Sequence, residues 1–132
     1  MRLKNLYIEG VHGAYYIPTV EFNSETGICK ISGESYLEDT GSFYAPLLEW
    51  IETYFKKIKS ALVVIFDLEY YNTSSSKCIV DMLALLKKYK DMGNNITVNW
   101  YYKSDSEDYE EEIEEVEDFM IETGIDINLI KK

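Results

Sequence analysis

Several kinds of residue are scarce in this 132-residue chain, and each scarcity argues against a class of chemistry. The two cysteines, Cys29 and Cys78, lie far apart without the spacing of metal ligands, so we expect free thiols and no zinc site. The only histidine, His12, sits in a glycine-flanked segment and is expected to be a surface residue rather than a catalytic base. No glycine-rich phosphate loop occurs. We therefore expect neither a cofactor nor a metal.

Long apolar runs and basic residues are also in short supply. The N-terminus lacks the hydrophobic segment of a signal peptide and no stretch is long enough to span a membrane, which predicts a cytoplasmic protein. Thirteen Lys and Arg stand against 24 Asp and Glu, which gives a net charge of −11. Such a field repels nucleic-acid backbones and anionic lipids, so we expect neither as a partner. The acidic run at residues 107–118 matches no calcium loop and is interpreted as a solvated helix face.

What is present is the pattern of one folded domain over residues 1–132. Apolar runs and alternation predict strands at residues 3–10, 19–23, 28–32, 61–66, 96–102 and 127–130. Apolar residues at intervals of three and four predict helices at about 41–58, after residues 72–76 up to Gly93, and over the acidic segment. Residues 61–66 lack alternation, which predicts a strand buried on both faces, and this strand is expected to continue to Tyr70. A hairpin followed by helices alternating with strands predicts an α/β fold, a mixed β-sheet packed by α-helices.

The strongest local signal for function is a cluster of hydroxyl residues between a strand and a helix. Thr73 precedes the helical pattern, which is the position of an N-cap. Capping by Thr73 or Ser74 explains one hydroxyl, but four in succession at residues 73–76 exceed what a cap requires. A phosphate on Thr73 would add about −1.5 to −2 charges at the positive end of the helix dipole. Lys77, four residues on, could pair with it, so the cluster suggests a phosphorylation switch at Thr73.

The residues around Thr73 are predicted to form a partner-binding surface. Its members are Tyr70, Tyr71, Asn72, Ser74, Ser75, Ser76 and Lys77. Adjacent tyrosines in an extended segment point to opposite sides, so at least one should be exposed, and exposed tyrosine is a common interface anchor. No convincing base accompanies Ser75 or Ser76 as a nucleophile, and the end of a strand explains Asp67 and Glu69. We therefore expect no catalytic residue and no enzyme activity.

Residues 68–78, Leu-Glu-Tyr-Tyr-Asn-Thr-Ser-Ser-Ser-Lys-Cys, resemble the signature of the SiaC family of bacterial regulatory phosphoproteins. Further matches, in the family's order, are residues 18–22, 26–27, 31–35, 43–47 with Trp50, and 98–102. The chain departs from the family at residues 36–39, where the family more often has a Pro-Glu-Asn-like stretch. The resemblance implies a single STAS-like domain, similar to anti-sigma-factor antagonists, with Thr73 as the phosphoacceptor because it is the only threonine of the motif.

The resemblance also implies partners. In the family's best-known member, a protein kinase and a PP2C-type phosphatase set the switch, and the unphosphorylated form binds and activates a diguanylate cyclase. That activation raises cyclic di-GMP and shapes biofilm behaviour. We therefore expect a phosphorylation-switched regulator that takes part in signal transduction. Two alternatives stay open at this point: a constitutive structural adaptor that uses the same surface, and a small hydrolase or transferase that uses the serine cluster.

Overall fold

The computed structural model describes residues 3–13, 15–105 and 109–132 of the chain. Within these residues it consists of a six-stranded sheet, a two-stranded ribbon and three helices. In chain order the elements are β1 (Leu6–Ile8), β2 (Val11–His12), β3 (Tyr16–Ile17), β4 (Thr19–Asn23), β5 (Ile28–Ser35), α1 (Thr40–Lys57), β6 (Leu62–Tyr71), α2 (Thr73–Asp91), β7 (Ile96–Tyr102), α3 (Tyr109–Thr123) and β8 (Asn128–Lys131).

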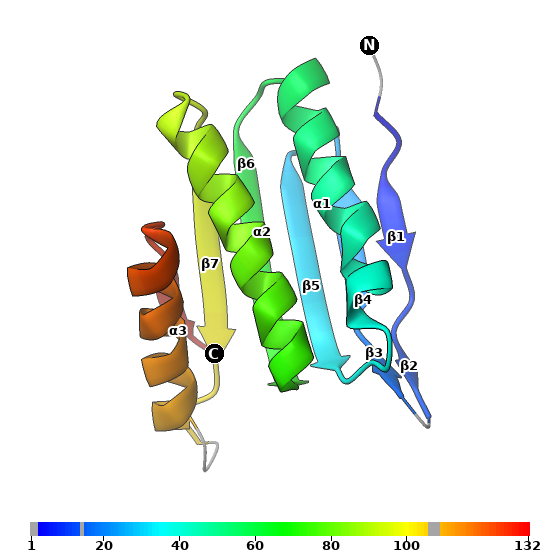
Figure 1. Ribbon diagram of the computed structural model, residues 1–132, viewed down its shortest axis with the longest axis vertical. Helices are drawn as coiled ribbons and strands as arrows, with labels where there is room; N and C mark the ends of the chain where they lie inside the picture. Colours follow the sequence, from blue (N-terminus) through cyan, green and yellow to red (C-terminus); the bar gives the residue numbers. More distant parts are fainter. Residues whose placement is uncertain (1–2, 14, 106–108) are drawn as a thin grey trace.

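The large sheet is mixed, as the sequence predicts. Its strand order is β1-β4-β5-β6-β7-β8; β4 pairs antiparallel with both β1 and β5, and all pairs from β5 to β8 are parallel. Each parallel connection passes through one helix and moves one strand further in the same direction. Because such crossovers are right-handed, all three helices fall on the same side of the sheet. Figure 1 shows α1, α2 and α3 side by side in front of the strands.

The one-sided cover corrects the expectation that residues 61–66 form a strand buried on both faces. In β6, Leu62, Val64 and Phe66 are buried beneath the helices, whereas the alternate residues Val63 and Ile65 are only half-buried. Within the described residues no helix covers that second face, which we call the open face of the sheet. β6 shows no polar alternation because apolar residues, Val63 and Ile65, also occupy its partly exposed face. The hydrophobic core lies on the other face, beneath the helices.

The elements meet the sequence predictions closely in the helices and less closely in the strands. α1 begins and ends within about one residue of the predicted positions, whereas α2 begins at Thr73, inside the hydroxyl segment after which the apolar pattern predicts the helix. The ribbon of β2 and β3, which pairs Val11 with Ile17, has no counterpart in the sequence analysis. β5 extends beyond its predicted end to Ser35, and β6 ends at Tyr71, within one residue of the strand end expected at Tyr70. The carboxyl ends of parallel strands share one edge of the sheet. No helix in the described ranges is long and apolar enough to cross a membrane.

Candidate functional site

The hydroxyl cluster lies at the junction of β6 and α2, on the carboxyl edge of the sheet. Asn72 has an extended backbone (φ −85°, ψ 176°), and its side-chain oxygen accepts a hydrogen bond from the Ser75 backbone N–H at 2.9 Å. Asn72 is therefore the N-cap, and Thr73 follows it directly, which agrees with the expectation that Thr73 lies at the cap or within about one residue of it. Asparagine caps a helix at least as well as threonine. Thr73 is the first helical residue, and its side chain is exposed.

The hydroxyls of the cluster have different environments. The Ser74 Oγ lies 2.8 Å from the Thr40 Oγ1 and donates to the Asn72 side-chain oxygen at 3.2 Å. The Ser76 hydroxyl donates to the backbone carbonyl of Thr73 at 2.9 Å. Among the hydrogen bonds of the described residues, the Thr73 hydroxyl takes part in none. Thr73 thus presents the exposed hydroxyl that is not engaged by the fold.

Ser75 is fully buried, so the expectation that it contacts a partner is wrong. The Ser75 Oγ donates to the Ser35 carbonyl at 3.0 Å and lies 2.7 Å from the Ser35 Oγ, which is itself 2.8 Å from the Tyr44 OH. The Ser75 hydroxyl has one proton, which it donates to the Ser35 carbonyl. The Ser35 hydroxyl must therefore donate to the Ser75 Oγ, and the Tyr44 hydroxyl to the Ser35 Oγ. Burial raises the pKa of Tyr44 to about 12, so this phenol stays protonated and continues to donate its hydrogen bond to Ser35. Ser75 is buried because it lies four residues before the buried Ile79, on the face of α2 that packs on the sheet.

These hydroxyls join the starts of two helices. Thr40 is the first residue of α1, as Thr73 is of α2, and Thr40 bonds directly to Ser74. The backbone N–H of Asn72 also donates to the Ser35 carbonyl at 3.1 Å, at the end of β5. Hydrogen bonds therefore connect the cap of α2, the start of α1 and the end of β5. They fix the backbone of the first turn of α2, and thereby the position of Thr73.

The exposed side of Thr73 opens into a shallow hollow between α2 and α3. Thr73 and Lys77 line this hollow together, as expected for two residues four positions apart on a helix. Phe119 and Glu122 of α3 line it from the other side, and Asp81 of α2 adds a second carboxylate. The hollow that Thr73 lines therefore also contains one lysine and two carboxylates. Thr73 itself stands at the end of α2 where the dipole is positive.

The two tyrosines at the end of β6 separate as their adjacency predicts. Tyr70 is 49% exposed. Tyr71 instead packs edge-on against Trp100, with ring centroids 5.7 Å apart, and burial together with the Glu115 carboxylate raises its pKa. Tyr71 thus helps to pack α3 on the sheet, and the expectation that it belongs to a partner surface is not supported by its position.

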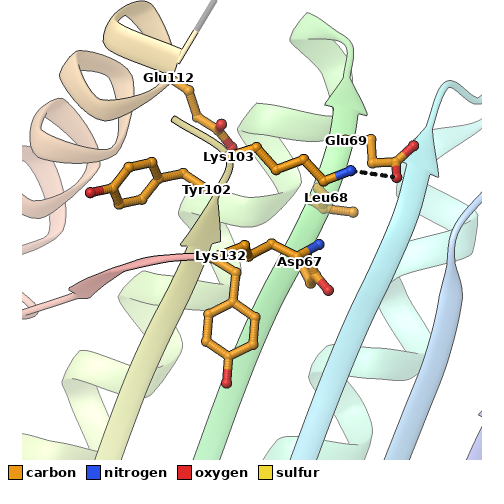
Figure 2. A pocket seen from close by; sticks show the side chains of 8 residues that line it. Asp67, Leu68, Glu69, Tyr102, Lys103, Glu112 and Lys132 are labelled. Carbon is orange, nitrogen blue, oxygen red and sulfur yellow. Dashed lines mark hydrogen bonds and ion pairs between the residues drawn. The ribbon is translucent and has the colours of Figure 1, made fainter. Parts of the chain in front are cut away.

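A second hollow, of about 220 Å³, lies beside the ends of β6 and β7 and contains Asp67 and Glu69. Figure 2 shows the Lys103 side chain reaching Glu69, an ion pair of 3.6 Å. The Lys132 Nζ contacts Asp67 at 2.7 Å, and the Lys30 Nζ lies 3.9 Å from the same carboxylate. The two carboxylates are therefore neutralised by separate lysines. Sequence reasoning missed these pairs because the lysines come from distant segments.

Glu112 of α3 reaches the same hollow from the helix side. Its Oε2 accepts a hydrogen bond from the Trp100 indole N–H at 2.8 Å. Partial burial raises the pKa of Glu112, and this effect outweighs the opposite effect of the indole hydrogen bond. The hydrogen bond between Trp100 of β7 and Glu112 therefore anchors the start of α3 to the sheet.

The serines of the cluster have no chemical partner for nucleophilic catalysis. In the part of the chain that the structure describes, their hydroxyls bond to other hydroxyls, an amide and backbone carbonyls, with no carboxylate, imidazole or amine. His12 lies in β2 and contacts Tyr16 instead. The described residues also contain no group of three or more His, Cys, Asp or Glu side chains that could hold a metal ion. A nucleophilic serine needs a base, and the geometry offers none.

The fold and the site together define a small α/β domain with an exposed threonine hydroxyl at the start of a helix. A protein-family model described as SiaC family regulatory phosphoprotein matches residues 11–132. The chain therefore belongs to the SiaC family, and the family resemblance inferred from the sequence is confirmed.

Related proteins support the same assignment. An uncharacterised protein of Pseudomonas aeruginosa strain UCBPP-PA14 is 26% identical over 113 residues, which cover 86% of this chain and 87% of the relative. The solved structure of SiaC of Pseudomonas aeruginosa covers 98% of this chain and 100% of that one, with a TM-score of 0.85 and 22% identity. SiaC in the crystal structure of the diguanylate cyclase SiaD with its activator SiaC, from the same organism, matches with a TM-score of 0.81, 22% identity and coverage of 95% and 100%. The predicted α/β fold is confirmed.

Proposed function

We propose that this protein is a phosphorylation-switched regulator, with Thr73 as the phosphoacceptor, whose unphosphorylated form binds and activates a diguanylate cyclase. The observation that carries the proposal is the exposed Thr73 hydroxyl at the first position of α2, beside serine hydroxyls that the fold already engages. The SiaC of the solved complex activates such a cyclase, and this chain shares its fold and family. The protein itself performs no reaction in this scheme.

The environment of Thr73 suits a switch because a phosphate changes the surface and leaves the core untouched. A phosphate at the first helical position adds about −1.5 to −2 charges near free backbone N–H groups and the helix dipole, which favour it. Lys77 supplies one cation in the same hollow, while Asp81 and Glu122 oppose the new charge. A partner that covers Thr73 would have to desolvate the phosphate without sufficient cations, at a cost of several kcal/mol. Phosphorylation should therefore release the effector.

The proposal requires two further partners, a protein kinase that modifies Thr73 and a PP2C-type phosphatase that restores it. Both would need access to the hydroxyl, which the exposed position of Thr73 allows. We also place the protein in the cytoplasm, where a kinase and a cyclase find their nucleotide substrates. Its two cysteines are free thiols, which agrees with a reducing compartment.

The proposal is tested with a diguanylate cyclase from the same organism, purified and assayed for cyclic di-GMP synthesis. Wild-type protein and Thr73→Ala should activate the cyclase, and Thr73→Asp and the kinase-treated protein should not. Thr26→Asp is the matched control, because Thr26 is an exposed threonine in the turn between β4 and β5, at the opposite edge of the sheet. Mass spectrometry of the protein from its native cell should find phosphate on the Thr73 peptide.

Equal activation of the cyclase by wild type, Thr73→Ala, Thr73→Asp and the kinase-treated protein would show that charge at Thr73 is not the switch. It would favour a constitutive adaptor that uses the same surface without modification. Phosphate found only on another peptide would move the switch to that residue, and Thr73 would then serve only as the first residue of α2.

A further inference from the structure

A row of aromatic side chains crosses the carboxyl edge of the sheet. Consecutive ring centroids lie 5.2 Å apart between His12 and Tyr16, 6.3 Å between Tyr16 and Tyr36, and 6.2 Å between Tyr36 and Tyr70. The tyrosines come from β3, from the residue after β5 and from β6, segments far apart in the chain. Tyr16 and Tyr36 are fixed by two backbone hydrogen bonds of 2.9 and 2.8 Å. We call Tyr16, Tyr36 and Tyr70 the tyrosine row.

The tyrosine row lies on the open face of the sheet. Ser35 points toward the helices, where it bonds to Tyr44 and Ser75, so the next residue, Tyr36, points to the other face. Tyr71 packs against Trp100 on the helix side, so Tyr70 also points to the open face. The hydroxyl of Thr73 opens between α2 and α3 instead. The tyrosine row and the Thr73 hollow are therefore separate surfaces, which revises the expectation that Tyr70 frames Thr73.

Carboxylates accompany the row. A register shift between Gly33 and Glu34 places Glu34 directly opposite Tyr70 on the neighbouring strand, and paired residues share a face. Glu38 accepts a hydrogen bond of 2.8 Å from Tyr15, next to Tyr16 in the chain. Glu69 precedes Tyr70 and is paired with Lys103. The aromatic faces and the Glu34 carboxylate together form an electron-rich surface on a protein of net charge −11.

Exposure makes this row a candidate for binding. Tyr36 is 43% exposed and Tyr70 is 49% exposed, and clustered exposed aromatics on a small domain mark interaction sites. A guanidinium group fits such a surface because it stacks flat on an aromatic ring and pairs with a carboxylate in two hydrogen bonds. A lysine ammonium satisfies only part of this geometry, and an acidic group is repelled.

We propose that the tyrosine row, with Glu34, is a second interaction surface that binds an arginine-bearing segment of a partner protein, with a guanidinium stacked on Tyr36 or Tyr70 and paired with Glu34. The surface is independent of the charge at Thr73, because it lies on the other face of the sheet. It therefore extends the proposed function without depending on it: one partner contact responds to phosphorylation, and the other holds whether or not Thr73 is modified.

The test uses defined peptides and isotope-labelled full-length protein. The probe is acetyl-Arg-Leu-Arg-Leu-Arg-amide, compared with the same peptide containing lysine or glutamate in place of arginine. On titration, the backbone amide signals of Glu34, Tyr36 and Tyr70 should shift with the arginine peptide, more weakly with the lysine peptide and not with the glutamate peptide. The double substitution Tyr36→Ala and Tyr70→Ala should weaken binding by roughly tenfold, and Glu34→Gln should weaken it by a smaller factor.

Two matched controls separate the row from general attraction to an acidic protein. Tyr7→Ala removes a 64% exposed tyrosine from β1 of the same sheet, and Glu114→Gln removes an exposed carboxylate from α3; both should bind the arginine peptide as wild type does. Thr73→Asp should also bind it unchanged, even where it abolishes cyclase activation. Thermal melts of each variant verify folding, and the exposure of the tyrosines makes large losses unexpected.

Several outcomes would overturn the proposal. Shifts confined to α3, equal weakening by Tyr7→Ala, or no shift with the arginine peptide would each show that the row does not select a guanidinium. Sedimentation that shows self-association of the wild type, lost when both row tyrosines are replaced, would assign the row to a second copy of this chain. None of these results bears on activation of the cyclase through Thr73, so the two proposals fail separately.

Discussion

The position of the cap makes the stability of α2 depend on Asn72 and not on Thr73. Asn72→Ala removes the acceptor of the 2.9 Å bond from the Ser75 N–H and of the 3.2 Å bond from the Ser74 hydroxyl. Loss of an N-cap side chain lowers the free energy of unfolding by about 0.5–2 kcal/mol. Thr73→Ala removes an exposed side chain and introduces a better helix former, so its effect should stay within about 0.5 kcal/mol.

Both variants are compared by urea unfolding and by thermal melts at one pH. For a domain of this size, Asn72→Ala should lower Tm by about 2–7 °C, and Thr73→Ala should leave it within about 2 °C of wild type. Thr73→Asp should match or slightly exceed the wild type, because a negative charge in the first turn of a helix is worth about 0.3–1 kcal/mol. If Thr73→Ala lost as much stability as Asn72→Ala, Thr73 would contribute to the cap, and the assignment of a free hydroxyl would be refuted.

Three further predictions concern buried or tightly packed positions in different parts of the domain. Ser75→Ala should lower the free energy of unfolding by about 1–3 kcal/mol, because it leaves the buried Ser35 hydroxyl without an acceptor. Ser76→Ala, the control, should change it by less than about 0.5 kcal/mol. Equal losses for the two variants would contradict the buried hydrogen bonds of Ser75. Because burial raises the native pKa of Glu112, its charged form is disfavoured in the fold, and stability should fall as pH rises from the ordinary glutamate pKa through the raised value. Glu112→Gln should remove that fall and leave stability at acid pH nearly unchanged, and a parallel pH profile for this variant would refute the assignment. Gly27→Ala should lose more than about 2 kcal/mol, because φ is +73° and a Cβ there would meet a backbone carbonyl, whereas Gly41→Ala has open space and should gain about 0.5–1 kcal/mol in denaturant unfolding.

The sequence predicted most of the elements because their signals are local. The three-and-four spacing of apolar residues in α1 and α2 is a property of consecutive residues, and both helices are present where the spacing predicts them, although α2 begins earlier, at Thr73. The exposed position of Thr73 next to a helix cap follows from the change of pattern at the end of β6. The sequence places the cap only to within about one residue, because Asn72 and Thr73 are both good capping residues and the choice depends on the backbone angles of the turn.

By itself, then, the sequence determined the α/β class, the order of helices and strands, and the hydroxyl cluster at the start of α2. Only the tertiary structure decided which face of the sheet the helices cover, since that depends on the handedness and direction of three crossovers. That one-sided cover leaves Ile65 half-buried and aligns the tyrosine row on the open face, while it buries Ser75 against Ser35. These contacts join residues about 20 to 40 positions apart, and local patterns carry no information on such pairs because strand register and packing are properties of the whole domain.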